Sequence, residues 1–143
     1  PDMITEAVEP MLSDLDINVV NLKSKIKTFG EFEDHNCIKV VCDLESNAIY
    51  FSREPIPTRS KTKDVPMAKQ VCVIPFRRDF LLEYNQRAPT PLEIAESIDM
   101  MRVLEHGMKV RMVDTKYRTH AVDTKQDLIK VETLIKNNIP NQL

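Results

Sequence analysis

An aspartate placed directly before a predicted helix is the residue of this chain best suited to chemistry. Asp123 lies in Ala121-Val122-Asp123-Thr124, where a strand or loop passes into a helix N-terminus, and ligands of open α/β sheets usually bind at that edge. A carboxylate there can hold Mg²⁺, which takes one or two carboxylates and completes its shell with water and phosphate oxygens. The same residue can instead cap the helix. Spacing alone leaves both roles open and favours the cap.

An arginine at the end of a predicted strand is the second candidate. Arg53 directly follows Ala48-Ile49-Tyr50-Phe51-Ser52 and precedes Glu54-Pro55-Ile56-Pro57. Its guanidinium should therefore lie at the fixed end of a strand, next to this stiff proline-containing segment, where it can bind a carboxylate or a phosphate. The alternative is an ordinary surface arginine that pairs with Glu54 or Asp64. The two interpretations carry similar weight.

Several other kinds of site are excluded by residue counts and spacing. The chain has only two glycines, Gly30 and Gly107, too few for a loop that wraps phosphates in backbone amides. It has no Gly-x-Ser-x-Gly elbow to support a hydrolase triad. Its three cysteines are too few and too irregularly spaced for a disulfide framework or a four-cysteine zinc site, so we expect reduced thiols in a cytoplasmic protein.

Length and charge indicate one soluble domain. The chain has 143 residues and a formal net charge of −2, from 20 Lys and Arg against 22 Asp and Glu. So small a charge gives no field to attract nucleic acid or an anionic membrane, and no apolar run reaches the roughly 20 residues of a membrane helix. Because Pro1-Asp2 resembles the start of a helix already under way, we expect the sequence to be a piece of a longer protein.

The elements that must position these residues can be predicted from periodicity and from turn and cap signals. Residues 2–14 and 28–34 are expected to be helical, residues 17–22 to form a strand, and residues 37–42 and 48–52 to form a hairpin. Residues 53–66, with three prolines, should be an exposed loop. Residues 70–76 should form a strand covered on both faces, followed by a helix over 79–86.

The last third of the chain is expected to contain two further helices and a strand. Thr90-Pro91-Leu92-Glu93 carries a capping box and should start one helix that ends at Gly107. Its core-facing stripe would comprise Ile94, Ile98, Met101 and Leu104. A strand over 109–113 precedes a helix after Asp123, whose inward face would comprise Leu128, Val131, Leu134 and Ile135. The order of elements predicts an α/β fold with a mixed sheet and one inserted hairpin.

Five collinear sequence blocks resemble one enzyme family. The blocks are DLESNAIYFSREPIP at 43–57, FRRDFL at 76–81, PTPLE at 89–93, MRVLEHG at 101–107 and AVDT at 121–124. They are similar to the 3-deoxy-manno-octulosonate cytidylyltransferases, or CMP-Kdo synthetases, which carry an A-x-Y-F-S-R-x-P-I-P block. The resemblance implies the C-terminal portion of a Rossmann-like nucleotide-diphospho-sugar transferase fold, with a β-hairpin dimerisation arm.

The activity implied by the resemblance is the transfer of CMP from CTP to an acidic keto sugar, which releases pyrophosphate and serves lipopolysaccharide biosynthesis. In the family the aspartate of the V-D-T block is a magnesium ligand, so Asp123 inherits a catalytic and metal-binding role, with Mg²⁺ as the cofactor. Residues Tyr50 to Pro57 resemble the arm through which members of the family form homodimers. The resemblance therefore implies a homodimer, with Ile49 and Phe51 at the interface rather than in the core.

The same resemblance assigns a sugar pocket whose residues depart from the family pattern. The family's H-x-G-I-Y strand is replaced by Gln70-Val71-Cys72-Val73-Ile74, and its E-Q-L-R by Asp99-Met100-Met101-Arg102. The expected substrate-binding residues are therefore Arg53, Gln70, Ile74, Asp99 and Met100. Because an unpaired buried hydroxyl costs about 1–3 kcal/mol, these changes predict an altered choice of sugar.

In the sequences of the family, the phosphate loop and the G-D-E-P motif with its metal-binding aspartate lie N-terminal to the part that resembles this chain. Residues 1–143 are therefore expected to be the sugar-binding and dimerisation half of a cytidylyltransferase, without the CTP-binding half and inactive alone. The alternative is a non-catalytic sugar-binding or assembly module derived from the same family.

Overall fold

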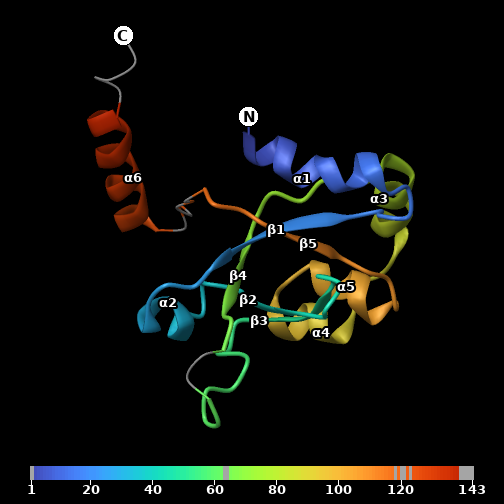
Figure 1. Cartoon of the computed structure of the whole chain (residues 1–143), viewed down its shortest axis with the longest axis horizontal. Coiled ribbons are helices and arrows are strands. Elements are labelled where there is room, and N and C mark those ends of the chain that lie inside the picture. Colours follow the sequence, from blue (N-terminus) through green and yellow to red (C-terminus); the bar gives the residue numbers. More distant parts are fainter. Residues whose placement is uncertain (1, 63–64, 118, 120–121, 123, 139–143) are drawn as a thin grey trace.

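A computed structural model describes residues 2–62, 65–117, 119, 122 and 124–138 of the chain. The helices are α1 (Asp2–Ser13), α2 (Phe29–Glu33), α3 (Arg78–Gln86), α4 (Pro91–Glu96), α5 (Met100–Glu105) and α6 (Lys125–Asn138). The strands are β1 (Val20–Lys25), β2 (Lys39–Cys42), β3 (Ala48–Ser52), β4 (Ala68–Val71) and β5 (Arg111–Asp114). They form one sheet in the order β3-β2-β4-β1-β5 (Figure 1). Strands β1 and β5 are parallel and the other pairs antiparallel, which confirms the predicted α/β fold with a mixed sheet.

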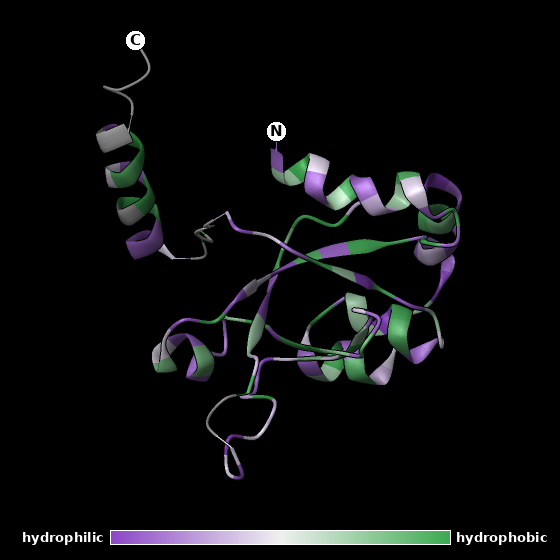
Figure 2. Ribbon diagram, viewed as in Figure 1, coloured by the Kyte–Doolittle hydropathy of each residue, from purple (hydrophilic) through white to green (hydrophobic). Residues whose placement is uncertain are grey.

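The sheet curves until its two outer strands touch. The Ala48 backbone N–H donates to the Val110 carbonyl (2.9 Å), and the Met112 N–H donates to the Ser46 carbonyl (2.8 Å). The concave side, closed by α3, α4 and α5, holds the main core, and Figure 2 shows apolar residues on the elements that face it. That core comprises Val19, Val40, Ala48, Phe51, Tyr84, Ile98, Met100, Met101, Val103, Val110 and Met112. Helix α1 covers the opposite face of β1 through smaller clusters around Ala7 and Met11.

Two predicted strands differ from the observed ones at their ends. Strand β1 starts at Val20 rather than Ile17, because Val19 meets Phe76 only through an isolated bridge. The strand predicted over 70–76 ends at Val71, where the Val73 N–H donates to the Val71 carbonyl (2.7 Å) and turns the chain sharply. The expectation that this strand is covered on both faces is also wrong, since Cys72 is exposed.

The single helix predicted from Thr90 to Gly107 is two helices, α4 and α5. Its predicted ends are confirmed: Thr90 and Glu93 form the capping box, and Gly107 has a positive φ of 73°. The break falls at Ser97, which adopts a left-handed conformation with φ 54° and ψ 49°. This break moves Ile94 out of the predicted core stripe and leaves it 69% exposed, whereas Ile98 is buried.

Two further expectations about apolar side chains are wrong. Phe51 is fully buried in the main core and is not an interface residue, while its neighbour Ile49 is 60% exposed. On α6, the side chains of Leu128, Leu134 and Ile135 face solvent rather than inward. They are exposed because, in the described part of the chain, no element packs over this helix, which stands apart from the sheet (Figure 1).

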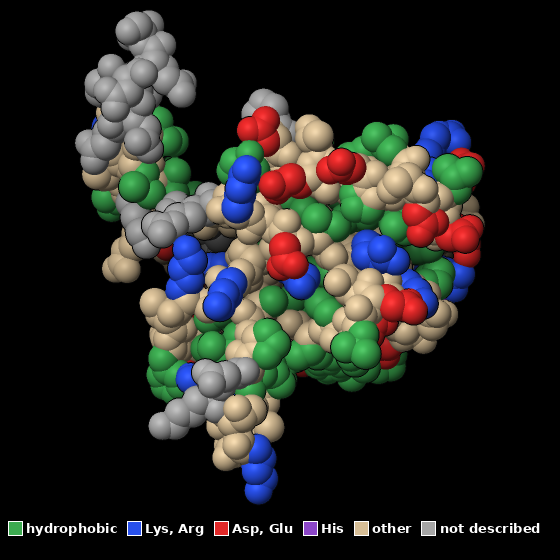
Figure 3. Space-filling view, viewed as in Figure 1, with side chains coloured by type: hydrophobic (Ala, Val, Ile, Leu, Met, Phe, Trp, Pro, Cys, Tyr) green, Lys and Arg blue, Asp and Glu red, His purple; other side chains and the backbone are tan. Residues whose placement is uncertain are grey.

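The surface and helix lengths agree with the composition. Figure 3 shows acidic and basic side chains interspersed over the face in view. Within the described residues, every helix is too short or too polar to cross a bilayer. The loop after β3 is largely exposed, as predicted, and its Ile56–Pro57 peptide bond is cis.

Candidate functional site

Arg53 joins the end of β3 to the C-terminal end of α4. Its backbone N–H donates to Oε2 of Glu96 (2.9 Å). Its guanidinium donates through Nε to the Glu96 carbonyl (2.7 Å), through Nη2 to the Ser97 carbonyl (3.1 Å) and through Nη1 to the His35 carbonyl (3.0 Å). The guanidinium is therefore fixed by three backbone carbonyls, and its predicted partner Glu54 instead lies 3.4 Å from His35.

The Glu96 carboxylate accepts hydrogen bonds from residues of β3 and from Arg53, which directly follows this strand. Besides the Arg53 N–H, Oε1 accepts from the Ser52 hydroxyl (2.9 Å) and the Tyr50 hydroxyl (3.1 Å). Burial raises the pKa of Glu96, but these hydrogen bonds and the nearby Arg53 charge outweigh it and hold the pKa below its usual range. Glu96 is thus an anion that orders the end of β3 at neutral pH.

A fully buried lysine completes this cluster. Lys39 lies on β2, and its Nζ donates to the carbonyls of Asp34 (2.9 Å) and Arg53. Burial lowers the pKa of Lys39, and its electrostatic interactions with the Cys37 thiol and with the carboxylates of Asp34, Glu54 and Glu96 oppose this shift. Lys39, Arg53 and Glu96, called here the Arg53 cluster, thereby tie together α2, β2, β3 and α4.

Sequence reasoning missed Lys39 and Glu96. A signal for Lys39 exists in Ile38-Lys39-Val40-Val41, where a charge interrupts an apolar run. Lysine is almost never fully buried unless it is paired, so a lysine in such a run indicates a specific partner. Glu96 offers no comparable signal, because a glutamate at a helix end is ordinary.

A hollow of about 470 Å³ lies beside the Arg53 cluster. Its lining residues are Pro89, Glu93, Ile94, Ser97, Ile98 and Asp99. Ser97 belongs to both features, since its carbonyl accepts from Arg53. Asp99 is exposed there, and among the described residues its carboxylate has no hydrogen bond or ion pair.

The wall of the hollow is held by a buried ion pair between α4 and α5. Arg102 donates through Nε and Nη2 to the two oxygens of Glu93, at 2.7 and 2.5 Å. The Arg102 guanidinium also lies 4.6 Å from the centre of the Tyr84 ring, and the Tyr84 hydroxyl donates to the Asp99 carbonyl (3.0 Å). The hydrogen bonds from Arg102 lower the pKa of Glu93 despite its burial. These contacts fix the backbone that presents Asp99.

Gln70 makes its contacts within the sheet rather than at the hollow. Its Nε2 donates to Oδ1 of Asn21 (2.6 Å), and Asn21, fully buried on β1, donates to the Val71 carbonyl (2.8 Å). Asn21 is a third residue that sequence reasoning missed, although an amide between Val20 and Leu22 is a visible signal.

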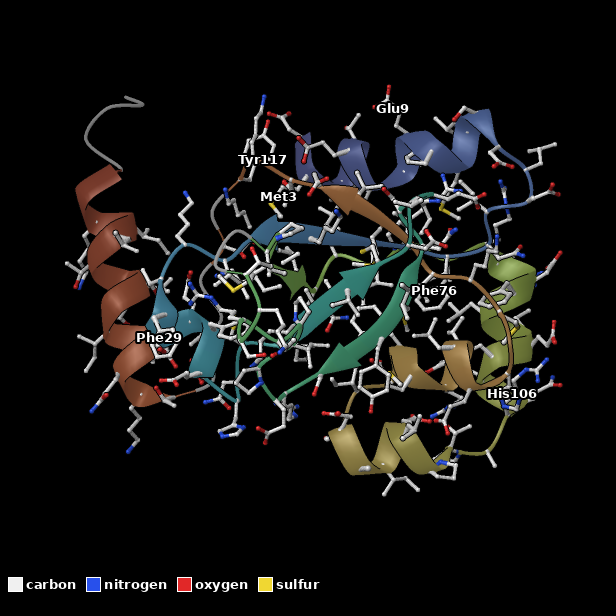
Figure 4. The ribbon with its side chains drawn as sticks, turned by 60° about the horizontal axis from the view of Figure 1, so that its bottom comes forward. Met3, Glu9, Phe29, Phe76, His106 and Tyr117 are labelled. Atoms are coloured by element: carbon white, nitrogen blue, oxygen red, sulfur yellow. The ribbon has the colours of Figure 1, made fainter. Side chains whose placement is uncertain are left out.

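The other predicted site residues are scattered. Met100 is 1% exposed in the main core, and Ile74 packs against that core from its edge. Phe76, labelled in Figure 4, stacks against Phe80 on α3 with ring centres 6.3 Å apart. Of the predicted site residues only Asp99 lines the hollow; Arg53 reaches its edge through the Ser97 carbonyl, and Gln70, Ile74 and Met100 are not among its lining residues.

Asp123 lies outside the described residues. The helix that it was expected to cap is capped by Thr124, whose Oγ1 accepts from the Asp127 N–H (3.2 Å) while Asp127 accepts from the Thr124 N–H (3.0 Å). Among the residues that the structure describes, no three His, Cys, Asp or Glu side chains are grouped closely enough to hold a metal ion.

The comparisons with known proteins agree with this fold over nearly the whole chain. A family model described as "Cytidylyltransferase" matches residues 1–110. A protein of Geobacter metallireducens named "3-deoxy-manno-octulosonate cytidylyltransferase" is 43% identical over 142 residues, which cover 92% of this chain and 56% of the relative. A protein of the same name from Geotalea uraniireducens is 41% identical and covers 95% of this chain and 59% of the relative.

A solved structure is similar in three dimensions as well. The structure of "CMP:2-keto-3-deoxy-manno-octonic acid synthetase complexed with CTP" superimposes with a TM-score of 0.89 at 29% identity and covers 96% of this chain but 56% of that one. The chain thus spans little more than half the length of the relatives it matches. A family match over most of the chain, together with this shared fold, shows that the chain belongs to the cytidylyltransferase family.

Proposed function

We propose that this chain is the sugar-binding and dimer-forming portion of an enzyme that transfers CMP from CTP to an acidic keto sugar. The products are a CMP-sugar and pyrophosphate. The observation that carries the proposal is the similarity, over 92% of this chain, to a relative named 3-deoxy-manno-octulosonate cytidylyltransferase. The remaining portion of such an enzyme would supply the CTP-binding residues.

Arg53 and Asp99 are the residues proposed to meet the sugar. A hollow of about 470 Å³ is within the range of small-molecule sites. Arginine has five N–H donors, of which Arg53 uses three on carbonyls, so two remain for the carboxylate of an acidic sugar. The unpaired carboxylate of Asp99 would accept hydrogen bonds from sugar hydroxyls. Gln70, Ile74 and Met100 do not line this hollow, so the proposal gives them no contact with the sugar there.

Mg²⁺ is proposed as the cofactor, with Asp123 as its protein ligand. The family resemblance supports this role, and Mg²⁺ commonly uses one or two carboxylates together with substrate phosphates. The ion would neutralise charge that develops on the α-phosphate and on the leaving pyrophosphate. Asp123 would hold the ion beside the hydroxyl that attacks.

A homodimer in the cytoplasm, serving lipopolysaccharide biosynthesis, completes the proposal. The β2–β3 hairpin presents Ile49 at 60% exposure and Leu44 fully exposed, which is apolar surface suited to a second copy. Phe51 contributes to this interface only by fixing the hairpin from inside the core.

The direct test is reconstitution of activity. The portion of the Geobacter metallireducens relative that has no counterpart here would be combined with this chain, and pyrophosphate release would be measured with CTP, Mg²⁺ and 3-deoxy-manno-octulosonate. Asp99→Asn should lower kcat/KM about 10-fold or more, the size of one lost charged hydrogen bond. Asp79→Asn, at an exposed carboxylate paired with Arg78, is the control and should change nothing.

The second candidate is a non-catalytic binding or assembly module. It is favoured by the positions of Gln70, whose Nε2 bonds within the sheet to Asn21, and of Met100, which is enclosed in the main core, because neither residue lines the hollow. If the reconstituted protein binds CTP firmly but releases no pyrophosphate with any acidic keto sugar, the enzyme proposal is wrong and the module stands.

A further inference from the structure

A second hollow, of about 540 Å³, lies where the parallel strands β1 and β5 begin. Its lining residues come from four separate segments, within residues 14–19, 45–47, 80–83 and 108–111. In Figure 1 the starts of both strands lie on the side of the sheet where α3 packs. Among the described residues, none lines both this hollow and the one beside the Arg53 cluster. The second hollow is called here the β1–β5 pocket, and its volume is within the range of small-molecule sites.

The lining of the β1–β5 pocket combines apolar and charged side chains. Ile17 and Val19 are buried, and Phe80 and Met108 are half-buried. The charged lining residues, all of them half-buried or exposed, are Asp14, Asp16, Glu45, Glu83, Lys109 and Arg111. A ligand held there would therefore pack apolar atoms against the more buried residues and keep its charged groups near the solvent.

Most of the charged groups of the pocket already have partners within the protein. Glu45 lies 3.5 Å from Lys109, and Glu83 lies 2.5 Å from Arg87 on the same helix. Because opposite charges so close together largely cancel in the field that a ligand meets, these pairs give the pocket little preference for an ion of either sign. The preference is set by the groups that remain.

One guanidinium and one carboxylate remain without a charged partner. Arg111 donates through Nε to Oδ1 of Asn47 (3.1 Å), and among the described residues its two Nη groups have no partner. The Asp16 carboxylate likewise has no hydrogen bond or ion pair within the described part of the chain. The Asp16 N–H donates to Oδ1 of Asp14 (2.9 Å), which places a second negative charge nearby. Arg111 and Asp16 line one pocket without forming an ion pair with each other, so each is open to a different group of a ligand.

Contacts on both sides of the pocket hold these two groups in place. Arg77 donates through Nε to the Ile17 carbonyl (2.9 Å) and through Nη2 to the Asp14 carbonyl (3.1 Å), which fixes the loop after α1. On the other side, Asn47 pairs with Arg111 through an isolated antiparallel bridge and so joins the β2–β3 turn to β5. A site fixed before binding loses less conformational freedom when a ligand enters.

We propose that the β1–β5 pocket binds a free α-amino acid with an apolar side chain. Its carboxylate would accept hydrogen bonds from the Nη groups of Arg111, since the planar guanidinium matches a carboxylate through paired N–H donors. Its ammonium group would meet Asp16, with the charge of Asp14 adding to the attraction. Its side chain would pack against Phe80 and Met108. A ligand that carried only one of the two charges would leave Arg111 or Asp16 without a partner.

The test compares three probes of nearly the same shape by chemical-shift titration of this chain. The probes are L-leucine, 3-methylbutylamine, which lacks the carboxylate, and 4-methylpentanoate, which lacks the amine. We expect L-leucine to bind with a dissociation constant of about 1 mM or lower, as is open to a ligand of so few atoms. Each of the other two probes should bind about tenfold more weakly or worse, because each loses one charged hydrogen-bonding group.

Two substitutions assign each charge of the ligand to its partner. Asp16→Asn and Arg111→Gln should each weaken the binding of L-leucine about tenfold or more. Asp16→Asn should leave the binding of 4-methylpentanoate within about twofold, because that probe has no ammonium group. Asp79→Asn, at an exposed residue of α3 that does not line the pocket, is the matched control and should bind L-leucine within about twofold of the original protein.

The proposal is overturned if L-leucine shows no saturable binding up to about 10 mM, if either single-charge probe binds as tightly, or if both substitutions behave like the control. Arg111 also bonds to Asn47, so circular dichroism must show that Arg111→Gln is folded. If it is not, Asp16→Asn, at an exposed loop position, decides the outcome with the three probes. Pyrophosphate release is a separate measurement, so a failure of this proposal and a failure of the proposed cytidylyl transfer are distinguishable.

Discussion

Replacing Arg53 tests whether its guanidinium is chiefly a structural clamp. Arg53→Met removes the hydrogen bonds to the carbonyls of Glu96, Ser97 and His35. A hydrogen bond from a charged donor contributes about 1.5–3 kcal/mol when fully buried. Two of the three bonds lie near the surface, so about 1 kcal/mol each is appropriate, or about 3 kcal/mol in total.

Urea unfolding followed by circular dichroism measures this loss. Arg53→Lys keeps the charge but not the planar fork, so it should recover about a third of the loss. Arg78→Met removes an exposed arginine whose side chain is 83% accessible, and as a control it should change the free energy of unfolding by less than about 0.5 kcal/mol. A loss below about 1 kcal/mol for Arg53→Met would refute the clamp and leave the guanidinium free for a ligand.

Three further predictions concern the elements around this site. Phe51→Ala should lower the free energy of unfolding in urea by about 3–5 kcal/mol, because the ring is fully buried. Ile49→Ala on the same strand should lower it by less than about 1 kcal/mol, because Ile49 is exposed. Equal losses would contradict the observed orientation of these side chains on β3. Ser97→Gly should raise the unfolding free energy by up to about 1 kcal/mol, since glycine adopts φ 54° without strain, and a loss would count against the left-handed break. The lowered pKa of Glu96 stabilises the folded protein above the ordinary value of 4.5, and this contribution disappears as pH falls through the lowered pKa. The stability difference between the original protein and Glu96→Gln should therefore shrink in urea titrations from neutral pH to below that value, and a constant difference would contradict the assignment.

The sequence predicts most of this fold where the signals are local. The capping box at Thr90 and Glu93 and the left-handed Gly107 are determined by residues a few positions apart, and both are confirmed. The break at Ser97 is not predictable in this way. It depends on Arg53, more than forty residues earlier, whose guanidinium holds the Glu96 and Ser97 carbonyls.

The prediction of which apolar side chains face the core fails for a related reason. Alternation along β3 places Phe51 and Ile49 on the same face, yet one is buried and the other exposed. The curvature of the sheet decides this, because the Ala48 N–H donates to the carbonyl of Val110, the residue before β5, and this contact places the two ends of β3 in different surroundings. On α6, periodicity correctly identifies an apolar face but cannot reveal whether anything covers it.

The candidate site was predictable in part. Arg53 was identified as a fixed guanidinium, and its fixation is confirmed, although the partners are carbonyls rather than an anion. Asp99 was identified through the family resemblance and does line a hollow. Lys39 was missed because the carbonyls that accept from it belong to Asp34 and Arg53, a pairing that only the folded backbone creates.

The position of β1 between later strands affects the order in which the protein can assemble during synthesis. Strand β1 ends at Lys25, but its neighbours are β4, from Ala68, and β5, from Arg111. The hairpin of β2 and β3 can pair as soon as both have left the ribosome, whereas β1 must wait for roughly forty and then ninety residues of chain at about 5–20 residues per second. For those seconds Val20 and Leu22 of β1, which are fully buried in the folded protein, are without their neighbouring strands, and a nascent chain stalled there would be a natural client for chaperones.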